Sequence, residues 1–161
     1  MSERLARRQA HEVQYPSGEA FFGAFFATMA RGHWWSPSIA EKWYNYVYLP
    51  AMVRLIAKHH PARHEALELL DECKARGLKT AIYSDYGCVT DKLEALGIDP
   101  SQFALIISAP ELGALKPSQP CAQRVLELLD AKPETTLFVG DRDEKDGESA
   151  RSVGAKFLLI S

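Results

Sequence analysis

The sequence predicts an α/β protein, in which a parallel β-sheet is covered by helices and a purely helical region comes first. Up to about residue 60 the periodic segments repeat apolar residues at helical spacing. From residue 61 onward, short apolar runs of strand length alternate with helical segments. Strands separated by helices need crossover connections, which make successive strands parallel. We therefore expect a helical region over residues 1–60 and an α/β core over residues 61–161.

The helical region carries two helix-start signals and an aromatic face. Ser17 can cap a helix that runs to about residue 31, and Ser38 with Glu41 fits a capping box for a second helix. Pro50 lacks the amide hydrogen that a helix interior needs, so we expect it to break or kink this second helix. One broad apolar face of the first helix is formed by Phe21, Phe22, Phe25, Phe26 and Met29. We expect that face to pack in a core.

The core region reads as alternating helices and strands. The predicted helices cover residues 62–76, 89–96, 119–129 and 148–153, and the predicted strands cover residues 78–83, 103–107, 136–139 and 156–160. Gly77 and Gly97 follow the first two helices, where glycine readily takes the left-handed backbone that ends a helix. In open parallel sheets, ligands bind beyond the carboxyl ends of the strands. We therefore expect a functional site at that edge of the sheet.

Polar residues occur at or after the ends of three predicted strands. Ser84 follows the first of them, Lys116 lies in the loop after the second, and Asp141 with Asp146 follows the third. A hydroxyl and an amine suit the binding of phosphate oxygens, whereas carboxylates are the ligands that Mg²⁺ prefers. Phosphoryl transfer depends mainly on such positioned charge around the moving group. The pattern therefore predicts a magnesium-assisted phosphoryl-transfer site.

These residues, in this order, resemble the haloacid dehalogenase (HAD) superfamily of phosphohydrolases. Its second motif is matched by Ile82-Tyr83-Ser84, its third by Lys116-Pro117, and its fourth by the segment from Gly140-Asp141 to Asp146. The resemblance covers roughly residues 62–161. It implies a Rossmann-like core, a helical cap before the second motif, Mg²⁺ as cofactor and a small phosphorylated metabolite as substrate. By the same resemblance, Ser84 and Lys116 are catalytic and phosphate-binding, and Asp141 and Asp146 hold the metal.

One motif of the family has no match in this chain. The first motif, a strand ending in Asp-x-Asp, supplies the nucleophile and lies between the strands that carry the second and fourth motifs. Asp85 and Asp143 lie inside other motifs and cannot replace it. The missing strand removes hydrogen bonds worth roughly 1 kcal/mol each, so we expect an incomplete sheet and very little turnover.

Several explanations of this departure stay open. A truncated reading frame is the leading explanation, so that Met1 would not be the natural start, and a degenerate relative is the second. The chain is alternatively a non-catalytic phosphate- or Mg²⁺-binding module, or an interaction subunit whose sheet is completed by another chain.

Composition excludes several classes of partner. The net charge of −2 gives no reason to expect nucleic acid or an anionic membrane, and no apolar run reaches bilayer-spanning length. The three cysteines are odd in number and lack metal-ligand spacing, which favours a reduced, cytoplasmic setting. The arginines near the start, and Arg142 with Asp143, are expected to be solvated. Substrate identity and the oligomeric state, with a homo-oligomer possible, are not set by the sequence.

Overall fold

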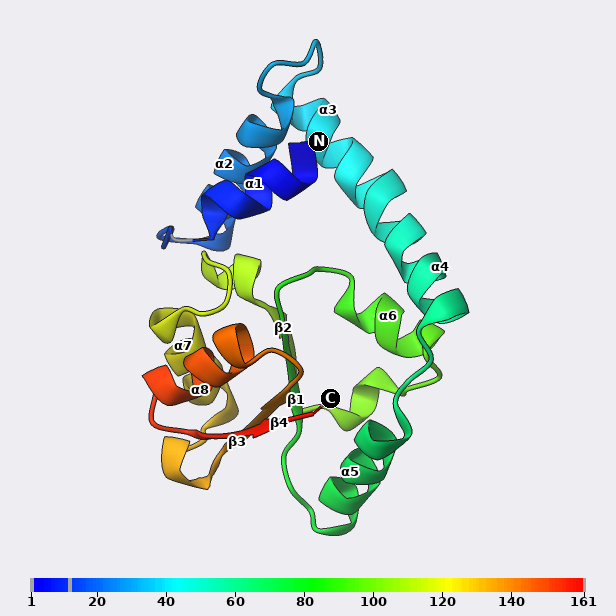
Figure 1. Cartoon of the computed structure of the whole chain (residues 1–161), viewed down its shortest axis with the longest axis vertical. Coiled ribbons are helices and arrows are strands. Elements are labelled where there is room, and N and C mark those ends of the chain that lie inside the picture. Colours follow the sequence, from blue (N-terminus) through cyan, green and yellow to red (C-terminus); the bar gives the residue numbers. More distant parts are fainter. Residues whose placement is uncertain (1, 12, 161) are drawn as a thin grey trace.

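The structure is a computed structural model that describes residues 2–11 and 13–160. Figure 1 shows a helical part at one end of the molecule and all strands at the other. The helical part consists of α1 (Ser2–Ala10), α2 (Gly18–Ala30), α3 (Pro37–Trp43), the π-helical segment η1 (Tyr44–Tyr48) and α4 (Leu49–His59). In the region described, no helix is long and apolar enough to cross a membrane.

The remaining elements alternate between helix and strand, as the sequence predicts. They are α5 (His64–Ala75), β1 (Ala81–Ser84), α6 (Val89–Ala95), β2 (Leu105–Ser108), α7 (Gln119–Leu129), β3 (Leu137–Gly140), α8 (Glu148–Ser152) and β4 (Lys156–Leu159). Short 3₁₀ turns lie at η2 (Pro100–Gln102), η3 (Ala109–Leu112) and η4 (Pro133–Thr135), and a π-helical segment, η5 (Asp143–Gly147), precedes α8.

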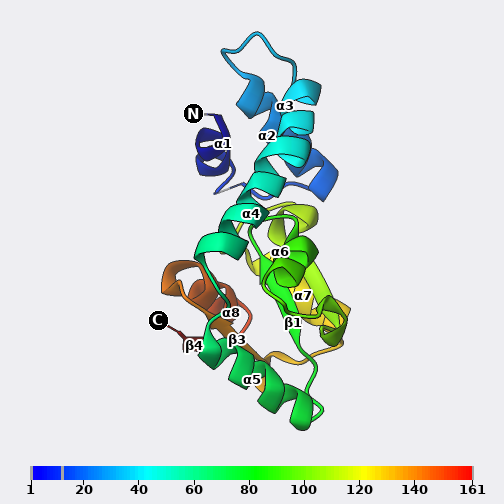
Figure 2. The same cartoon turned by 90° about the vertical axis from the view of Figure 1, so that its right-hand side faces the viewer.

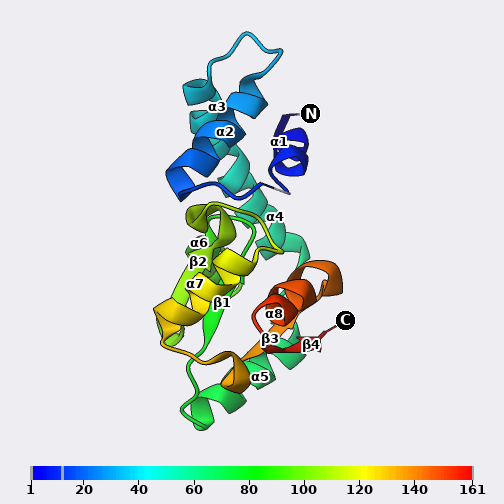
Figure 3. The same ribbon diagram turned by 90° about the vertical axis from the view of Figure 1, so that its left-hand side faces the viewer.

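The strands form two separate parallel pairs. In the first pair Ala81 of β1 lies opposite Leu105 of β2, and in the second Leu137 of β3 lies opposite Lys156 of β4. Across residues 2–11 and 13–160, no strand pairing joins one pair to the other. Figures 2 and 3 show β3 and β4 set apart from β1 and β2 when the molecule is seen from either side. The predicted α/β class with parallel strands is confirmed, and the division falls between the strands that carry Ser84 and Asp141.

The main hydrophobic core lies in the helical part. Phe21 is 1% exposed, and its ring stacks on Phe25 with centroids 5.9 Å apart, so the apolar face predicted for this helix is buried as expected. The same cluster includes Ala6 of α1 and reaches the α/β part through Leu115. This core therefore anchors the helical part against the loop that carries Lys116.

The second strand pair is much less covered. Four apolar side chains on it are exposed: Leu137, Val139, Leu158 and Leu159. Helix α5, which precedes β1, buries none of its residues. Because exposed apolar strand residues and unpaired edges are costly, this part of the molecule offers surface for a further element.

Two local predictions in the helical part are wrong. Ser36, and not Ser38, caps α3, because its hydroxyl accepts a hydrogen bond from Ile39 N at 3.4 Å and Pro37 fits the first helical turn. Pro50 does not break the helix, since η1 leads directly into α4. In η1 Leu49 N donates to Tyr44 O, five residues back, and such a wide turn relieves the clash that proline otherwise causes.

Candidate functional site

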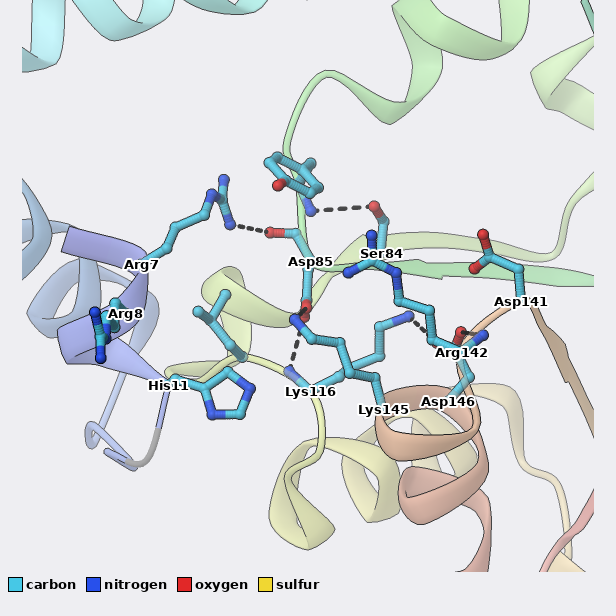
Figure 4. Close-up of a pocket in the computed structure, with 12 residues that line it drawn as sticks. Arg7, Arg8, His11, Ser84, Asp85, Lys116, Asp141, Arg142, Lys145 and Asp146 are labelled. Atoms are coloured by element: carbon cyan, nitrogen blue, oxygen red, sulfur yellow. Dashed lines mark hydrogen bonds and ion pairs between the residues drawn. The ribbon is translucent and has the colours of Figure 1, made fainter. Parts of the chain in front are cut away.

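The four site residues predicted from the sequence line one cavity of about 670 Å³. Figure 4 shows that Ser84, Lys116, Asp141 and Asp146 enter it from separate segments of the chain. The cavity lies at the carboxyl ends of β1 and β3, which is where parallel sheets bind ligands. The structure therefore brings together all four residues, and their individual roles stay predictions.

Ser84 is the last residue of β1 and is held by a local turn. Its hydroxyl accepts a hydrogen bond from Tyr86 N at 3.1 Å, while its backbone lies opposite Ser108 in the strand pair. The hydroxyl hydrogen is free to rotate toward a bound anion. The strand end therefore presents one adjustable donor to the cavity.

Lys116 is fixed by three hydrogen bonds. Its backbone N donates to Asp85 Oδ1 at 2.7 Å, and its Nζ donates to Tyr83 O at 3.2 Å and to Asp146 Oδ1 at 2.5 Å. The side chain is only 12% exposed. An ammonium has three donors, so one N–H of Lys116 remains for a ligand.

Asp146 and Asp141 differ in how far they are engaged. Asp146 Oδ1 accepts from Lys116 Nζ and Oδ2 accepts from Arg142 N at 3.3 Å. Gly140 permits this arrangement, because a Cβ at that position would collide with the Asp146 carboxylate. Asp141 is exposed and accepts no hydrogen bond from another described residue. Only Asp141 therefore offers a carboxylate without a competing partner.

The donor set fits Mg²⁺ in its chemistry, although it is small. Mg²⁺ commonly takes one or two carboxylates and fills its other positions with water and substrate oxygens. Among the residues described, no group of three or more His, Cys, Asp or Glu side chains is arranged to hold a metal. Asp141 is therefore the residue available for direct ligation, and Asp146 is shared with Lys116.

Two charged residues of the cavity were missed by the sequence analysis. Asp85 is 8% exposed, and its Oδ2 accepts a hydrogen bond from Lys145 Nζ at 3.0 Å. Asp85 directly follows Ser84 at a strand end, so the positional argument that selected Ser84 applies equally to it. Lys145 carried no such signal, because it lies within a charged run that resembles a solvated loop.

The prediction of solvated arginines near the start is wrong for Arg7. Its guanidinium pairs with Glu3, donates to Asp85 O and to Tyr44 OH at 3.0 Å each, and lies 3.7 Å from the Tyr86 ring centroid. Burial raises the pKa of Tyr44 to about 12, so this hydroxyl stays neutral at physiological pH. Helix α1 is thereby tied to the loop that follows Ser84.

The prediction for Arg142 and Asp143 is also only partly correct. Both are exposed, but they do not pair with each other: Asp143 pairs with Arg151 at 2.9 Å, and Arg142 lines the cavity. Arg8 and His11 of the N-terminal region line it as well and are exposed. The local charge run therefore divides between the site and the surface.

The cavity carries an excess of positive charge. Its cationic side chains are Arg7, Arg8, Lys116, Arg142 and Lys145, and its carboxylates are Asp85, Asp141 and Asp146. Five cations against three anions leave +2 with His11 neutral. Such a concave, positive site favours an anionic ligand.

Comparison with known proteins agrees with this chemistry. A family model described as a haloacid dehalogenase-like hydrolase matches residues 15–154. The chain is 35% identical over 101 residues to a glyceraldehyde 3-phosphate phosphatase of Methanocaldococcus jannaschii, covering 62% of this chain and 43% of that protein. It is 34% identical over 97 residues to a phosphoglycolate phosphatase of Aquifex aeolicus, covering 56% of this chain and 42% of that protein. The chain thus spans less than half the length of these two relatives.

Solved structures show the same fold. A HAD phosphatase from Thermococcus onnurineus matches with a TM-score of 0.65 at 20% identity, covering 89% of this chain and 68% of that one. A β-phosphoglucomutase from Clostridium difficile matches with a TM-score of 0.66 at 15% identity, covering 99% of this chain and 74% of that one. At these identities the likeness concerns the Rossmann-like architecture alone.

Proposed function

The chain belongs to the haloacid dehalogenase-like hydrolases, and from that premise we propose that its cavity is the phosphate site of a Mg²⁺-dependent phosphohydrolase acting on a small phosphorylated metabolite. The observation that carries this proposal is the convergence of Ser84, Lys116, Asp141 and Asp146 on one positively charged cavity. The names of the relatives, phosphatases of small phosphorylated compounds, support the substrate class.

Ser84 and Lys116 bind the phosphoryl oxygens in this proposal. The Ser84 hydroxyl donates one hydrogen bond, and the remaining N–H of Lys116 donates another that is assisted by charge. Both groups are already positioned by bonds to the protein, so little reorganisation is needed when charge develops on the phosphoryl group. Asp146 holds the Lys116 amine at this place.

Asp141 is the proposed ligand of Mg²⁺, with Asp146 beside it. When bound, the ion would supply charge neutralisation at the phosphoryl oxygens. The exposed Asp141 carboxylate leaves room for water and substrate oxygens around the same ion. The function of the two acids is thus divided between holding a metal and holding an amine.

The nucleophile is proposed to come from a strand outside the 161 residues. Of the acids inside the cavity, Asp85 and Asp146 are engaged by lysines, and neither belongs to a strand ending in Asp-x-Asp. The unpaired edges of β1 and β3, with exposed Val139 beside them, support a strand seated between the two pairs. In the completed protein, helices α1–α4 act as the cap over the cavity.

A second candidate is an interaction module whose sheet is completed by another chain, and which binds phosphate or Mg²⁺ without turnover. The observation that favours it is the exposed apolar surface of Leu137, Leu158 and Leu159 next to unpaired strand edges. Sedimentation distinguishes this candidate, because a partner strand from a second copy would give a stable dimer. A strictly monomeric, stably folded protein would count against it.

The primary proposal is tested with the purified chain, p-nitrophenyl phosphate and Mg²⁺. We expect very little hydrolysis by the chain alone, together with saturable binding of inorganic phosphate in calorimetric titration. Asp141→Ala tests the metal site, and Asp143→Ala is its matched control, since Asp143 is exposed and pairs with Arg151. Robust hydrolysis abolished by Asp141→Ala alone would show that the chain already contains its nucleophile.

A further inference from the structure

We propose that Lys145 is a phosphate-binding residue of the cavity and that Asp85 is the positioning residue that holds it there. The inference rests on the proposed function, since it takes the cavity to be a phosphate site. The two residues come from loops on opposite sides of the divided sheet: Asp85 follows β1, and Lys145 lies in η5 after β3. Their contact, Nζ to Oδ2 at 3.0 Å, spans 60 residues of sequence.

Counting hydrogen-bond donors favours Lys145 as a ligand for an anion. Two of the three Lys116 donors are taken, by Tyr83 O and by Asp146. Within the described part of the chain, Lys145 gives only one donor, to Asp85, and two remain. Its side chain is also more accessible, at 23% exposed against 12% for Lys116. Of the two amines, Lys145 therefore has the greater capacity to bind phosphate oxygens.

Asp85 fixes where that amine lies relative to Lys116. One of its carboxylate oxygens accepts the backbone N–H of Lys116 at 2.7 Å, and the other accepts the Lys145 amine. The residue is itself held, because Arg7 donates to its carbonyl oxygen at 3.0 Å. A single buried carboxylate therefore sets the backbone of one lysine and the side chain of the other.

Two ion pairs join the strand pairs at the cavity in a crossed arrangement. Figure 4 shows Lys116 reaching to Asp146 while Lys145 reaches to Asp85. Each pair connects the half that contains β1 and β2 to the half that contains β3 and β4. Because no backbone ladder joins these halves in the described residues, these side chains determine how the two walls of the cavity face each other.

The test is the affinity of the complete chain for inorganic phosphate, measured by calorimetric titration. Lys145→Met keeps the apolar stem and removes the amine, so we expect phosphate affinity to fall about tenfold. Lys156→Met is the matched control, because Lys156 is exposed on β4 and forms no ion pair in the described structure. That variant should bind as the unaltered chain does. Lys145→Gln replaces the methionine variant if circular dichroism shows that the latter unfolds.

The positioning role of Asp85 is tested by a double-mutant cycle. In an Asp85→Asn background, Lys145→Met should change phosphate affinity by less than about twofold, because the amine is no longer held at the site. A tenfold loss in both backgrounds would overturn the positioning role. Unchanged affinity for Lys145→Met, with affinity lost in Lys116→Met, would overturn the inference and leave the proposed function standing. No saturable phosphate binding by the unaltered chain would overturn both.

Discussion

The helical part and the α/β part of this molecule are organised by different forces. The helical part buries a continuous aromatic cluster, in which Phe21, Phe25 and Tyr44 are almost inaccessible. The second strand pair instead exposes Leu158 and Leu159, and it is joined to the first pair at the cavity by ion pairs. We infer that the helical part contributes more of the stability, while the α/β part carries the polar groups of the site.

The largest test of this contrast removes a buried ring. Phe21→Ala should lower the free energy of unfolding by about 3–5 kcal/mol, because it leaves a cavity in the best-packed region. Leu158→Ala, on the exposed strand pair, should change it by less than about 0.5 kcal/mol. Urea denaturation followed by circular dichroism measures both variants. Equal losses would show that the two parts are packed alike.

The second test uses pH and the buried phenol of the helical part. Burial raises the pKa of Tyr44 to about 12, against about 10 in an unfolded chain. The folded state therefore holds its proton more tightly, and stability should fall as pH rises from about 10 to 12, by about 2 kcal/mol. Tyr44→Phe should remove that part of the alkaline loss, while Tyr46→Phe, an exposed residue, should not. An identical alkaline loss in both variants would contradict the assignment.

The third test moves to the site. Gly140→Ala places a methyl group against the Asp146 carboxylate and should displace it from Lys116. We expect a loss of about 1–2 kcal/mol in stability, since the part-buried amine would lose its partner. Phosphate titration should show weaker binding as well. As a control, Gly23→Ala lies on an open face of α2 and should be neutral or slightly stabilising. Normal phosphate binding by Gly140→Ala would show that Asp146 does not set the position of Lys116.

The smallest effect on stability is expected for Asp141. Because this carboxylate is exposed and accepts no hydrogen bond from a described residue, Asp141→Asn should change the free energy of unfolding by less than about 0.5 kcal/mol. Mg²⁺ binding, followed by calorimetry, should nevertheless be strongly weakened. A variant that binds Mg²⁺ normally would remove Asp141 from the proposed metal site.

Much of the fold follows from sequence signals that act locally. The bounds of α7 agree with the prediction at both ends, since Ser118 caps its start and Asp130 takes a left-handed conformation after Leu129. Ser17 caps α2 as predicted, by accepting from Ala20 N. The convergence of Ser84, Lys116 and Asp141 also followed from the sequence, because parallel topology alone places strand ends at one edge.

The rest depends on contacts that no local pattern reveals. Arg7 reads as one of several basic residues on a short helix, yet its partner Asp85 lies 78 residues away. The unequal engagement of Asp141 and Asp146 likewise depends on where the Lys116 side chain runs. The cap at Ser36 and the π-helical turn before Pro50 were missed because several neighbouring serines and tyrosines satisfy the same local rules.

The π-helical segment Asp143–Gly147 has a consequence for how this site tolerates changes in chain length. A π turn holds one more residue than an α turn, and here it accommodates Lys145 and Asp146 side by side, each bonded to a different wall of the cavity. Deleting a single exposed residue such as Glu144 would return the segment to ordinary helical winding. Neighbouring side chains would then be rotated about the helix axis by roughly 100°. Both crossed bonds could not survive that rotation, so the spacing of this loop is as strict a requirement as the identity of its charged residues.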